Sequence, residues 1–192
     1  LGGMYYSTRP DALVVNLYGG STATVPAVGG SFNVTQKTGY PWDGRVTIRL
    51  DSAPADEHSI WLRIPGWSSE THLSINGAEF KPEEPISPGS YVQVRRRWNA
   101  GDSIELTLDM TPRRVYAHPA VKPDRGRVAI QRGPIVYCFE GIDQASPLSR
   151  LVVPSYAKMT TRFDRDLLGG VTTLDVPALA QDESTNWSRS EE

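Results

Sequence analysis

The sequence predicts an all-β protein, organised as an antiparallel β-sandwich in two sandwich units, the second of which is incomplete. Three observations lead to this fold class. Apolar residues recur with a period of two in several short runs, which is typical of strands with one buried and one hydrated face. Turn-forming residues separate those runs. No segment before residue 155 has the pattern of an amphipathic helix, and only residues 155–168 could hold a short one.

The predicted strands follow one another closely before residue 111. A short apolar run at residues 13–18 comes first. Strict alternation then begins at residues 45–50, where Val46, Ile48 and Leu50 would face the core. Antiparallel sheets show this alternation because one face packs on the core and the other meets water. The same pattern recurs in further runs, at residues 59–65, 72–76, 91–97 and 103–110.

Turn chemistry between these runs supports an antiparallel arrangement. Asn76-Gly77 is the strongest hairpin signal in the chain, because a type I′ turn needs positive φ at both central residues. Residues 71–75 and 78–80 would form the two arms of that hairpin. The turn at residues 99–102 joins two further predicted strands. Many short strands with close turns indicate a sandwich or a barrel.

The sequence predicts a domain boundary at Thr111-Pro112. The strands before this point suffice for one sandwich of roughly 100 residues, a common domain size. The strand-like segments at residues 113–140 are too few for a second one. We expect them to complete a sheet with residues 13–18 or with chain outside this sequence. The predicted parts are a first sandwich at residues 13–110, part of a second at 111–180 and a polar tail at 181–192.

Composition and charge exclude several classes of protein. The 192 residues carry 20 Lys+Arg and 22 Asp+Glu, and this net charge of −2 argues against a nucleic-acid partner. Cys138 is the only cysteine, so no internal disulfide can form. No apolar run approaches the length of a membrane span, and we expect no membrane partner. The start, Leu1-Gly2-Gly3, has no signal-peptide core. The sequence leaves the localisation undecided between the bacterial cytoplasm and secretion.

No constellation of residues in the sequence predicts a catalytic, cofactor-binding or metal-binding site. His58, His72 and His118 are scattered without metal-ligand spacing. We expect His72 on the hydrated face of a strand and His118 in a loop. Cys138 lies in an apolar strand, where we expect a small buried residue rather than a nucleophile. Paired catalytic carboxylates, a nucleophile elbow, a phosphate loop and a dinucleotide fingerprint are not found.

Aromatic residues offer a candidate binding feature. Five tryptophans accompany eight tyrosines, and Trp42 and Trp67 each lie in a predicted turn. Such side chains can stack on sugar rings or pack against another domain, and core filling explains most buried tryptophans equally well. The basic cluster Arg95-Arg96-Arg97 is expected to form a hydrated strand edge that blocks edge-to-edge pairing.

Several motifs taken together resemble the non-catalytic β half of glycoside hydrolase family 127, the β-L-arabinofuranosidase-like proteins. Their order and spacing are similar to the family pattern over about residues 1–145. The motifs are, in chain order, IWLRIPGW at residues 60–67, SING at 74–77, YVQV at 91–94 with Arg97-Trp98 and Gly101-Asp102, and RVAIQRGPIVYCFE at 127–140.

The resemblance implies that this chain follows a catalytic (α/α)6 barrel and that residues 1–12 are the tail of that barrel. In the family, a cysteine nucleophile, a glutamate acid/base and a zinc ion belong to the barrel. Cys138 does not match the nucleophile, because it lies in the later Arg-Gly-Pro motif. The resemblance therefore gives this chain no catalytic or cofactor-binding residue, and zinc is implied only for the missing barrel. Both ends of the chain suggest a fragment.

The resemblance also implies an accessory role. The sandwiches would pack on and stabilise the barrel of an enzyme that acts on plant-type glycans, and would be inactive alone. The expected partners are thus the missing barrel and, in a homodimer, a second copy. An independent carbohydrate-binding sandwich is the alternative, and a structural sandwich without a ligand is a third hypothesis. Trp42 and Trp67 would serve sugar stacking or interdomain contact.

Overall fold

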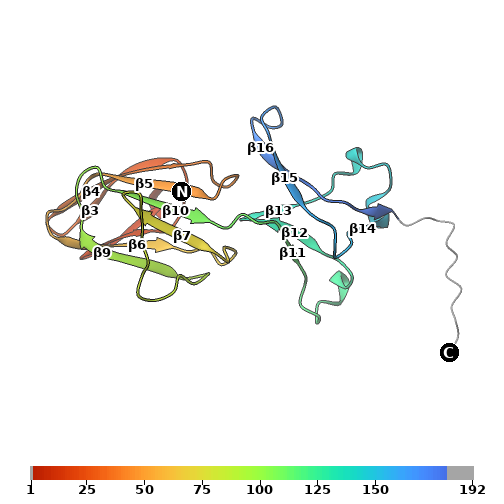
Figure 1. Ribbon diagram of the computed structural model, residues 1–192, viewed down its shortest axis with the longest axis horizontal. Coiled ribbons are helices and arrows are strands. Elements are labelled where there is room, and N and C mark those ends of the chain that lie inside the picture. The colour runs from red at the N-terminus through yellow and green to blue at the C-terminus, as the bar shows by residue number, and fades with distance from the viewer. Residues whose placement is uncertain (1, 181–192) are drawn as a thin grey trace, which may run out of the picture. The chain divides into compact units, whose positions relative to one another are not determined.

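A computed structural model describes residues 2–180 of the chain (Figure 1). The chain divides into two compact units, one up to Thr111 and one from Pro112. Strands make up most of the regular structure, and the predicted all-β fold class is confirmed. Within the described range, no helix has the length and apolar character needed to cross a membrane. The helical segments there are short 3-10 turns, at Gly2–Met4, Lys122–Asp124, Gly141–Asp143 and Leu148–Arg150.

The first unit is a sandwich of two sheets (Figure 1). The smaller sheet has the strand order β1-β2-β6-β9. Its strands are β1 (Tyr6–Arg9), β2 (Ala12–Val15), β6 (Glu57–Arg63) and β9 (Tyr91–Arg97). Neighbouring strands are antiparallel except β2 and β6, which run parallel. This pair departs from the predicted antiparallel arrangement. Three strands of the other sheet lie between β2 and β6 in the sequence and provide the long crossover that parallel pairing requires.

The larger sheet has the order β3-β4-β5-β10-β7-β8, and all of its neighbouring strands are antiparallel. The alternation predicted for residues 45–50 is confirmed, because Val46, Ile48 and Leu50 are fully buried. Burying one such side chain contributes roughly 1.5–3 kcal/mol. The strands of this sheet are β3 (Ser21–Ala27), β4 (Gly30–Thr38), β5 (Arg45–Ser52), β7 (Thr71–Ile75), β8 (Ala78–Glu79) and β10 (Ser103–Leu108).

The predicted hairpin at Asn76-Gly77 is confirmed. The two residues have φ of 52° and 79° and connect β7 to β8. The Asn76 side chain also fixes the turn between β9 and β10, because its amide donates to the Asp102 carboxylate over 2.8 Å. Desolvation alone would raise the pKa of Asp102. Hydrogen bonds from the Asn99 N–H and the Asn76 amide, together with the Arg96 charge, hold this pKa below its usual value.

Residues 6–9, which the resemblance placed at the end of a barrel, form the edge strand β1 of the smaller sheet. Tyr6 pairs with Val15 and Arg9 with Ala12. The Tyr6 side chain packs against the core, and its hydroxyl accepts a hydrogen bond of 2.8 Å from the buried Gln36 amide. These contacts make the segment part of the first unit.

The second unit contains three separate small sheets. Of the two alternatives expected for residues 113–140, a sheet shared with residues 13–18 is wrong, because β2 pairs with β6 in the first unit. The strands β11, β12 and β13 instead pair with one another. The strands of this unit are β11 (Arg113–Val115), β12 (Ala129–Arg132), β13 (Ile135–Tyr137), β14 (Leu151–Val152), β15 (Thr160–Asp164), β16 (Val171–Asp175) and β17 (Leu179–Ala180).

The second unit differs from the sequence analysis at two further places. Residues 155–168, which could have held a short helix, instead contain β15 at residues 160–164, which pairs with β16. Neighbouring Thr residues favour a strand, and positive φ at Leu168, Gly169 and Gly170 turns the chain back. Cys138 is exposed rather than buried. It follows β13, where the alternation puts it on the same side as the exposed Val136. The predicted polar tail at residues 181–192 lies outside the described residues.

Candidate functional site

Trp42 and Trp67 lie in two loops that meet the end of β10, where the chain leaves the first unit. The loop with Trp42 is held to β10 by a hydrogen bond of 3.0 Å from the Leu108 N–H to the Gly44 carbonyl. The loop with Trp67 is held to Asp109, just beyond β10, by side-chain and backbone hydrogen bonds. Both candidate residues are therefore placed at one end of the sandwich by contacts with the same strand.

Trp67 belongs to an aromatic cluster that extends the core. Its ring stacks on Tyr40, with centroids 6.4 Å apart and an interplanar angle of 22°. Tyr40 meets Tyr18 edge-on, and the Tyr18 hydroxyl donates to the Arg63 carbonyl over 2.6 Å. Burial raises the pKa of Tyr18 far above its usual range, so this hydroxyl stays protonated. One ring face of Trp67 is thus occupied by Tyr40, which suits packing better than sugar stacking.

Trp42 occupies the turn that follows the Tyr40-Pro41 peptide. Its backbone N–H donates to the Gly39 carbonyl over 2.9 Å, which closes the turn. The side chain is half-buried, like that of Trp67. The two tryptophans thus contribute partly exposed aromatic surface to this end of the unit.

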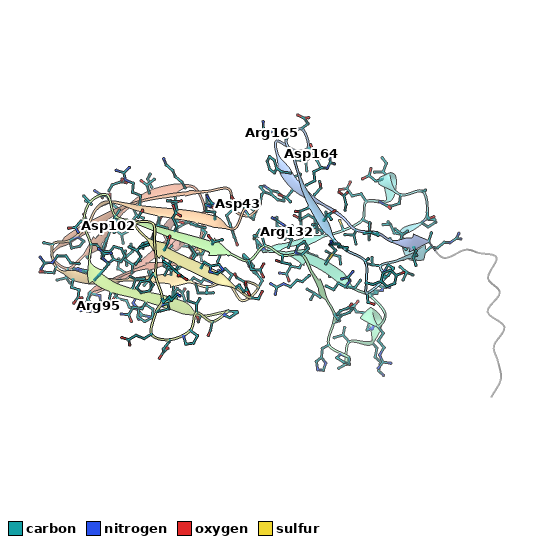
Figure 2. The ribbon with its side chains drawn as sticks, viewed as in Figure 1. Asp43, Arg95, Asp102, Arg132, Asp164 and Arg165 are labelled. Carbon is teal, nitrogen blue, oxygen red and sulfur yellow. The ribbon has the colours of Figure 1, made fainter. Side chains whose placement is uncertain are left out.

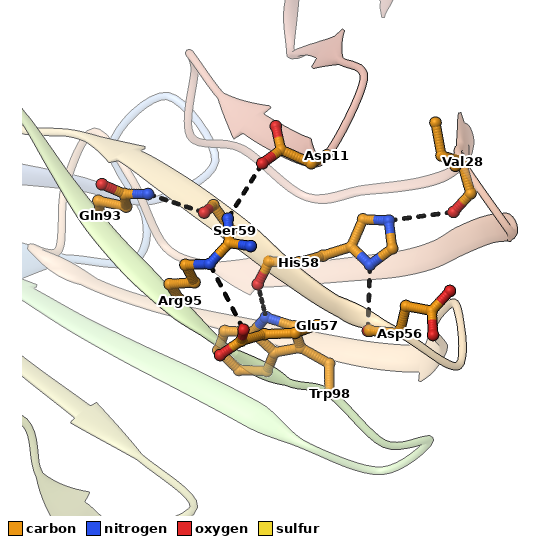
Figure 3. Close-up of polar contacts among 9 residues, drawn as sticks. All are labelled: Asp11, Val28, Asp56, Glu57, His58, Ser59, Gln93, Arg95 and Trp98. Atoms are coloured by element: carbon orange, nitrogen blue, oxygen red, sulfur yellow. Dashed lines mark hydrogen bonds and ion pairs between the residues drawn. The ribbon is translucent and has the colours of Figure 1, made fainter.

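A polar layer crosses β6 near its start (Figure 3). On the core side, the His58 ring lies with Nδ1 3.1 Å from the Asp56 carbonyl oxygen and Nε2 3.0 Å from the Val28 carbonyl oxygen. The ring also packs edge-on against Phe32 with centroids 5.7 Å apart. The Trp98 indole N–H donates to the His58 carbonyl over 3.0 Å. His58 is 3% exposed, so these contacts join β6 to β4, to the turn between β3 and β4 and to the residue that follows β9.

On the opposite side of β6, polar side chains lie on the outer surface of the smaller sheet (Figure 3). The Arg95 guanidinium donates to the Asp11 carboxylate over 3.0 Å and contacts Glu57 at 3.5 Å. The hydrogen bond from Arg95 holds the pKa of Asp11 below its usual value. Arg95 lies on β9, the edge strand (Figure 2). The predicted role of Arg95 at a hydrated edge therefore fits its position.

Alternation in β6 and β9 also brings an aromatic and basic cluster to this outer surface. We name it the arginine face and define it by six residues, Arg9, Trp61, Arg63, Tyr91, Gln93 and Arg95. Sequence reasoning treated Trp61 and Arg63 only as members of a family motif. The sequence did contain a signal that these two residues face outward. Ile60 and Leu62 face the core, so their neighbours in the strand must point to the other side of the sheet.

The histidines and carboxylates do not assemble into a reactive group among residues 2–180. His72 is exposed on β7, and His118 is exposed in a loop where its Nδ1 accepts a hydrogen bond from the Ala120 N–H. In that part of the chain, no three His, Cys, Asp or Glu side chains lie close enough to hold a metal ion.

Comparison with known proteins places both units in one family. Residues 12–110 match the middle domain of the β-L-arabinofuranosidases of glycoside hydrolase family 127. Residues 112–179 match the C-terminal domain of the same family. A non-reducing end β-L-arabinofuranosidase from Bifidobacterium longum is 38% identical over 157 residues, which cover 77% of this chain and 23% of that protein.

Solved structures agree with this assignment. A family 127 β-L-arabinofuranosidase from Geobacillus stearothermophilus T6 is 39% identical with a TM-score of 0.86, over 99% of this chain and 30% of that chain. A second structure, described as a glycoside hydrolase, is 30% identical with a TM-score of 0.87, over 98% of this chain and 31% of that one. The matched part of the chain thus spans 23–31% of the length of these relatives. It belongs to glycoside hydrolase family 127, of which it contains the middle and C-terminal domains.

Proposed function

We propose that this chain is the non-catalytic β-sandwich region of a glycoside hydrolase, and that it packs on and stabilises a catalytic (α/α)6 barrel outside the chain. One observation carries the proposal. Residues 12–110 and 112–179 match the middle and C-terminal domains of the family, and the relatives are about three times as long as this chain or longer. In this proposal the reaction takes place on the remaining part of the polypeptide.

Exposed apolar side chains support contact with further polypeptide. In the second unit, Ile142, Leu168 and Tyr156 are 91%, 87% and 82% exposed. A domain that packed over these side chains would remove their apolar surface from water, which is favourable. The half-buried Trp42 and Trp67 would add aromatic surface to such a contact. The barrel is the proposed partner, and a second copy of the chain would use the same kind of surface.

The proposal assigns zinc and substrate chemistry to the barrel. Zinc requires three or four clustered Cys, His or carboxylate ligands. Residues 2–180 hold no such group, so they do not fit a zinc site. The relatives named as β-L-arabinofuranosidases suggest that the complete protein releases terminal arabinofuranose from plant-type glycans. An independent carbohydrate-binding module is the second candidate function, and the arginine face favours it.

The 192-residue chain alone should not hydrolyse a nitrophenyl β-L-arabinofuranoside, with or without added zinc. Glycosidases need an acid and a nucleophile or base about 5–9 Å apart in a substrate pocket, whereas Asp11 and Glu57, the two carboxylates that contact Arg95, are exposed on the surface of a sheet. The measurement is nitrophenolate release, with the Cys138→Ala variant as a matched control for the one thiol. Turnover by the chain that disappears in Cys138→Ala would refute the non-catalytic assignment.

A further inference from the structure

The arginine face brings together side chains from three strands of the smaller sheet. The strand register places Trp61 opposite Gln93 and Arg63 opposite Tyr91. Arg9 reaches the same surface from β1, and its guanidinium carbon lies 5.3 Å from the centre of the Trp61 ring. These residues are distant in the sequence, and the pairing of β1, β2, β6 and β9 makes them neighbours.

Packing orders the centre of the arginine face before any ligand arrives. Ala12 and Val14 lie on the outer side of β2, yet both are buried. The long side chain of Arg9 and the Trp61 ring lie close enough to cover them. A guanidinium stacked on an indole is held in its plane while its N–H groups stay able to donate at the edge. Arg9 is therefore a positioned donor rather than a freely moving side chain.

The charge of this surface is positive although the chain as a whole is slightly acidic. The three arginines of the arginine face, on β1, β6 and β9, point outward, against the two carboxylates of Asp11 and Glu57. Both carboxylates contact Arg95. Within residues 2–180, neither Arg9, which lies over Trp61, nor Arg63 forms an ion pair, so both guanidinium groups are available to an anion.

Neutral groups next to these arginines suit a ring with hydroxyls. The Tyr91 ring is 42% exposed, and its hydroxyl donates to the Asn16 side-chain oxygen over 2.8 Å. The Asn16 amide in turn donates to the Ser7 hydroxyl over 3.1 Å, which fixes the orientation of Tyr91. Gln93 is held in the same way, because its amide donates to Ser59 over 2.7 Å. Oriented aromatic and amide groups are typical of sites that recognise flat polar ligands.

From this geometry we infer that the arginine face binds acidic carbohydrate, namely an oligosaccharide of uronic acids. Arg9 and Arg63 donate to sugar carboxylates, since guanidinium groups match carboxylates in a bidentate manner. Tyr91 and the exposed part of Trp61 contact sugar C–H groups. The choice of a glycan rests on the proposed function, whereas the preference for carboxylates rests on the unpaired arginines. The region would thereby hold acidic glycans near the enzyme.

The test is titration of the 192-residue chain with trigalacturonate in 0.15 M salt. Binding should shift the NMR signals of the Trp61 indole N–H and of the Arg9 and Arg63 side chains. Arg63→Met should weaken binding about tenfold, which corresponds to the loss of one charge-assisted hydrogen bond. The fold tolerates this change, because Arg63 holds Tyr18 through its backbone carbonyl. Arg9→Met should weaken binding similarly.

Arg49→Met is the matched control. Arg49 is an exposed arginine on the outer side of the larger sheet, where it contacts Asp51 at 3.4 Å. Its loss should leave the affinity unchanged. Two further probes are arabinotriose, which is neutral, and tricarballylate, which has three carboxylates but no ring. The inference is overturned if either binds as tightly as trigalacturonate, if trigalacturonate does not bind, or if Arg63→Met binds as well as the unchanged chain.

Failure of this inference can be told apart from failure of the proposed function. Absence of trigalacturonate binding removes the acidic-glycan site and leaves the packing of the region on a barrel untouched. Hydrolysis by the isolated chain would refute the accessory role and leave the measured binding intact. The two experiments therefore report on separate surfaces and separate claims.

Discussion

Replacing His58 with alanine is expected to lower the free energy of unfolding of the first unit by about 3–5 kcal/mol. The ring is buried against Phe32, and its removal leaves a cavity. The carbonyl oxygens of Val28 and Asp56 also lose a ring nitrogen within hydrogen-bond distance. The measurement is urea unfolding followed by tryptophan fluorescence, which reports mainly on the first unit because four of the five tryptophans precede Thr111.

His72→Ala is the matched control for this change. His72 is exposed on β7, so its loss should alter the free energy of unfolding by less than about 0.5 kcal/mol. Equal effects of the two substitutions would show that the buried layer at the start of β6 contributes little to stability.

Replacing Gly44 with alanine is expected to destabilise the first unit by about 2 kcal/mol or more. A Cβ atom at Gly44 would overlap the Leu108 carbonyl oxygen and lie 2.8 Å from Met110 Cγ. The loop with Trp42 or the end of β10 must then move, which strains the hydrogen bond from the Leu108 N–H. The same urea experiment measures the effect.

Gly20→Ala provides the comparison for Gly44→Ala. Gly20 has open space around it and no positive φ, so alanine there should be neutral within about 0.5 kcal/mol. If Gly44→Ala had the same free energy of unfolding as Gly20→Ala, Gly44 would not lie in close contact with the end of β10. Together the two variants test whether the close packing around Gly44, rather than the replacement of a glycine as such, determines the loss of unfolding free energy.

Local patterns were enough to predict much of the first unit. The period of two placed Val46, Ile48 and Leu50 in the core, and Asn76-Gly77 defined a hairpin, because both signals depend on neighbours in the sequence. The parallel pairing of β2 with β6 was not predictable in this way. It depends on which distant strands meet, and no local residue encodes that choice.

The second unit shows where the local sequence pattern gives a wrong expectation. Residues 155–168 were compatible with a short helix, but pairing with β16 makes residues 160–164 a strand. Propensity is a weak guide when tertiary pairing supplies the hydrogen bonds. Cys138 was misplaced because its apolar neighbours suggested burial, although alternation puts it on the exposed side with Val136.

The candidate surfaces were likewise predictable from the sequence only in part. The sequence pointed to Trp42 and Trp67 through their turns, but not to the stack of Trp67 on Tyr40, which joins two distant loops. The arginine face was partly accessible, because alternation in β6 already turns Trp61 and Arg63 away from the core. The arrival of Arg9 from β1 could not be predicted, since it depends on strand order.

The most direct test of the accessory role uses the complete polypeptide with the barrel that the proposal requires, and a version that lacks residues 1–192, because β1 already belongs to the first unit. Loss of the sandwiches should lower the Tm of the barrel by more than about 10 °C, because buried contact area is exposed, and should abolish arabinofuranoside hydrolysis. The excised 192-residue chain should stay folded and inactive. A shortened protein that keeps both its Tm and its activity would contradict the proposal.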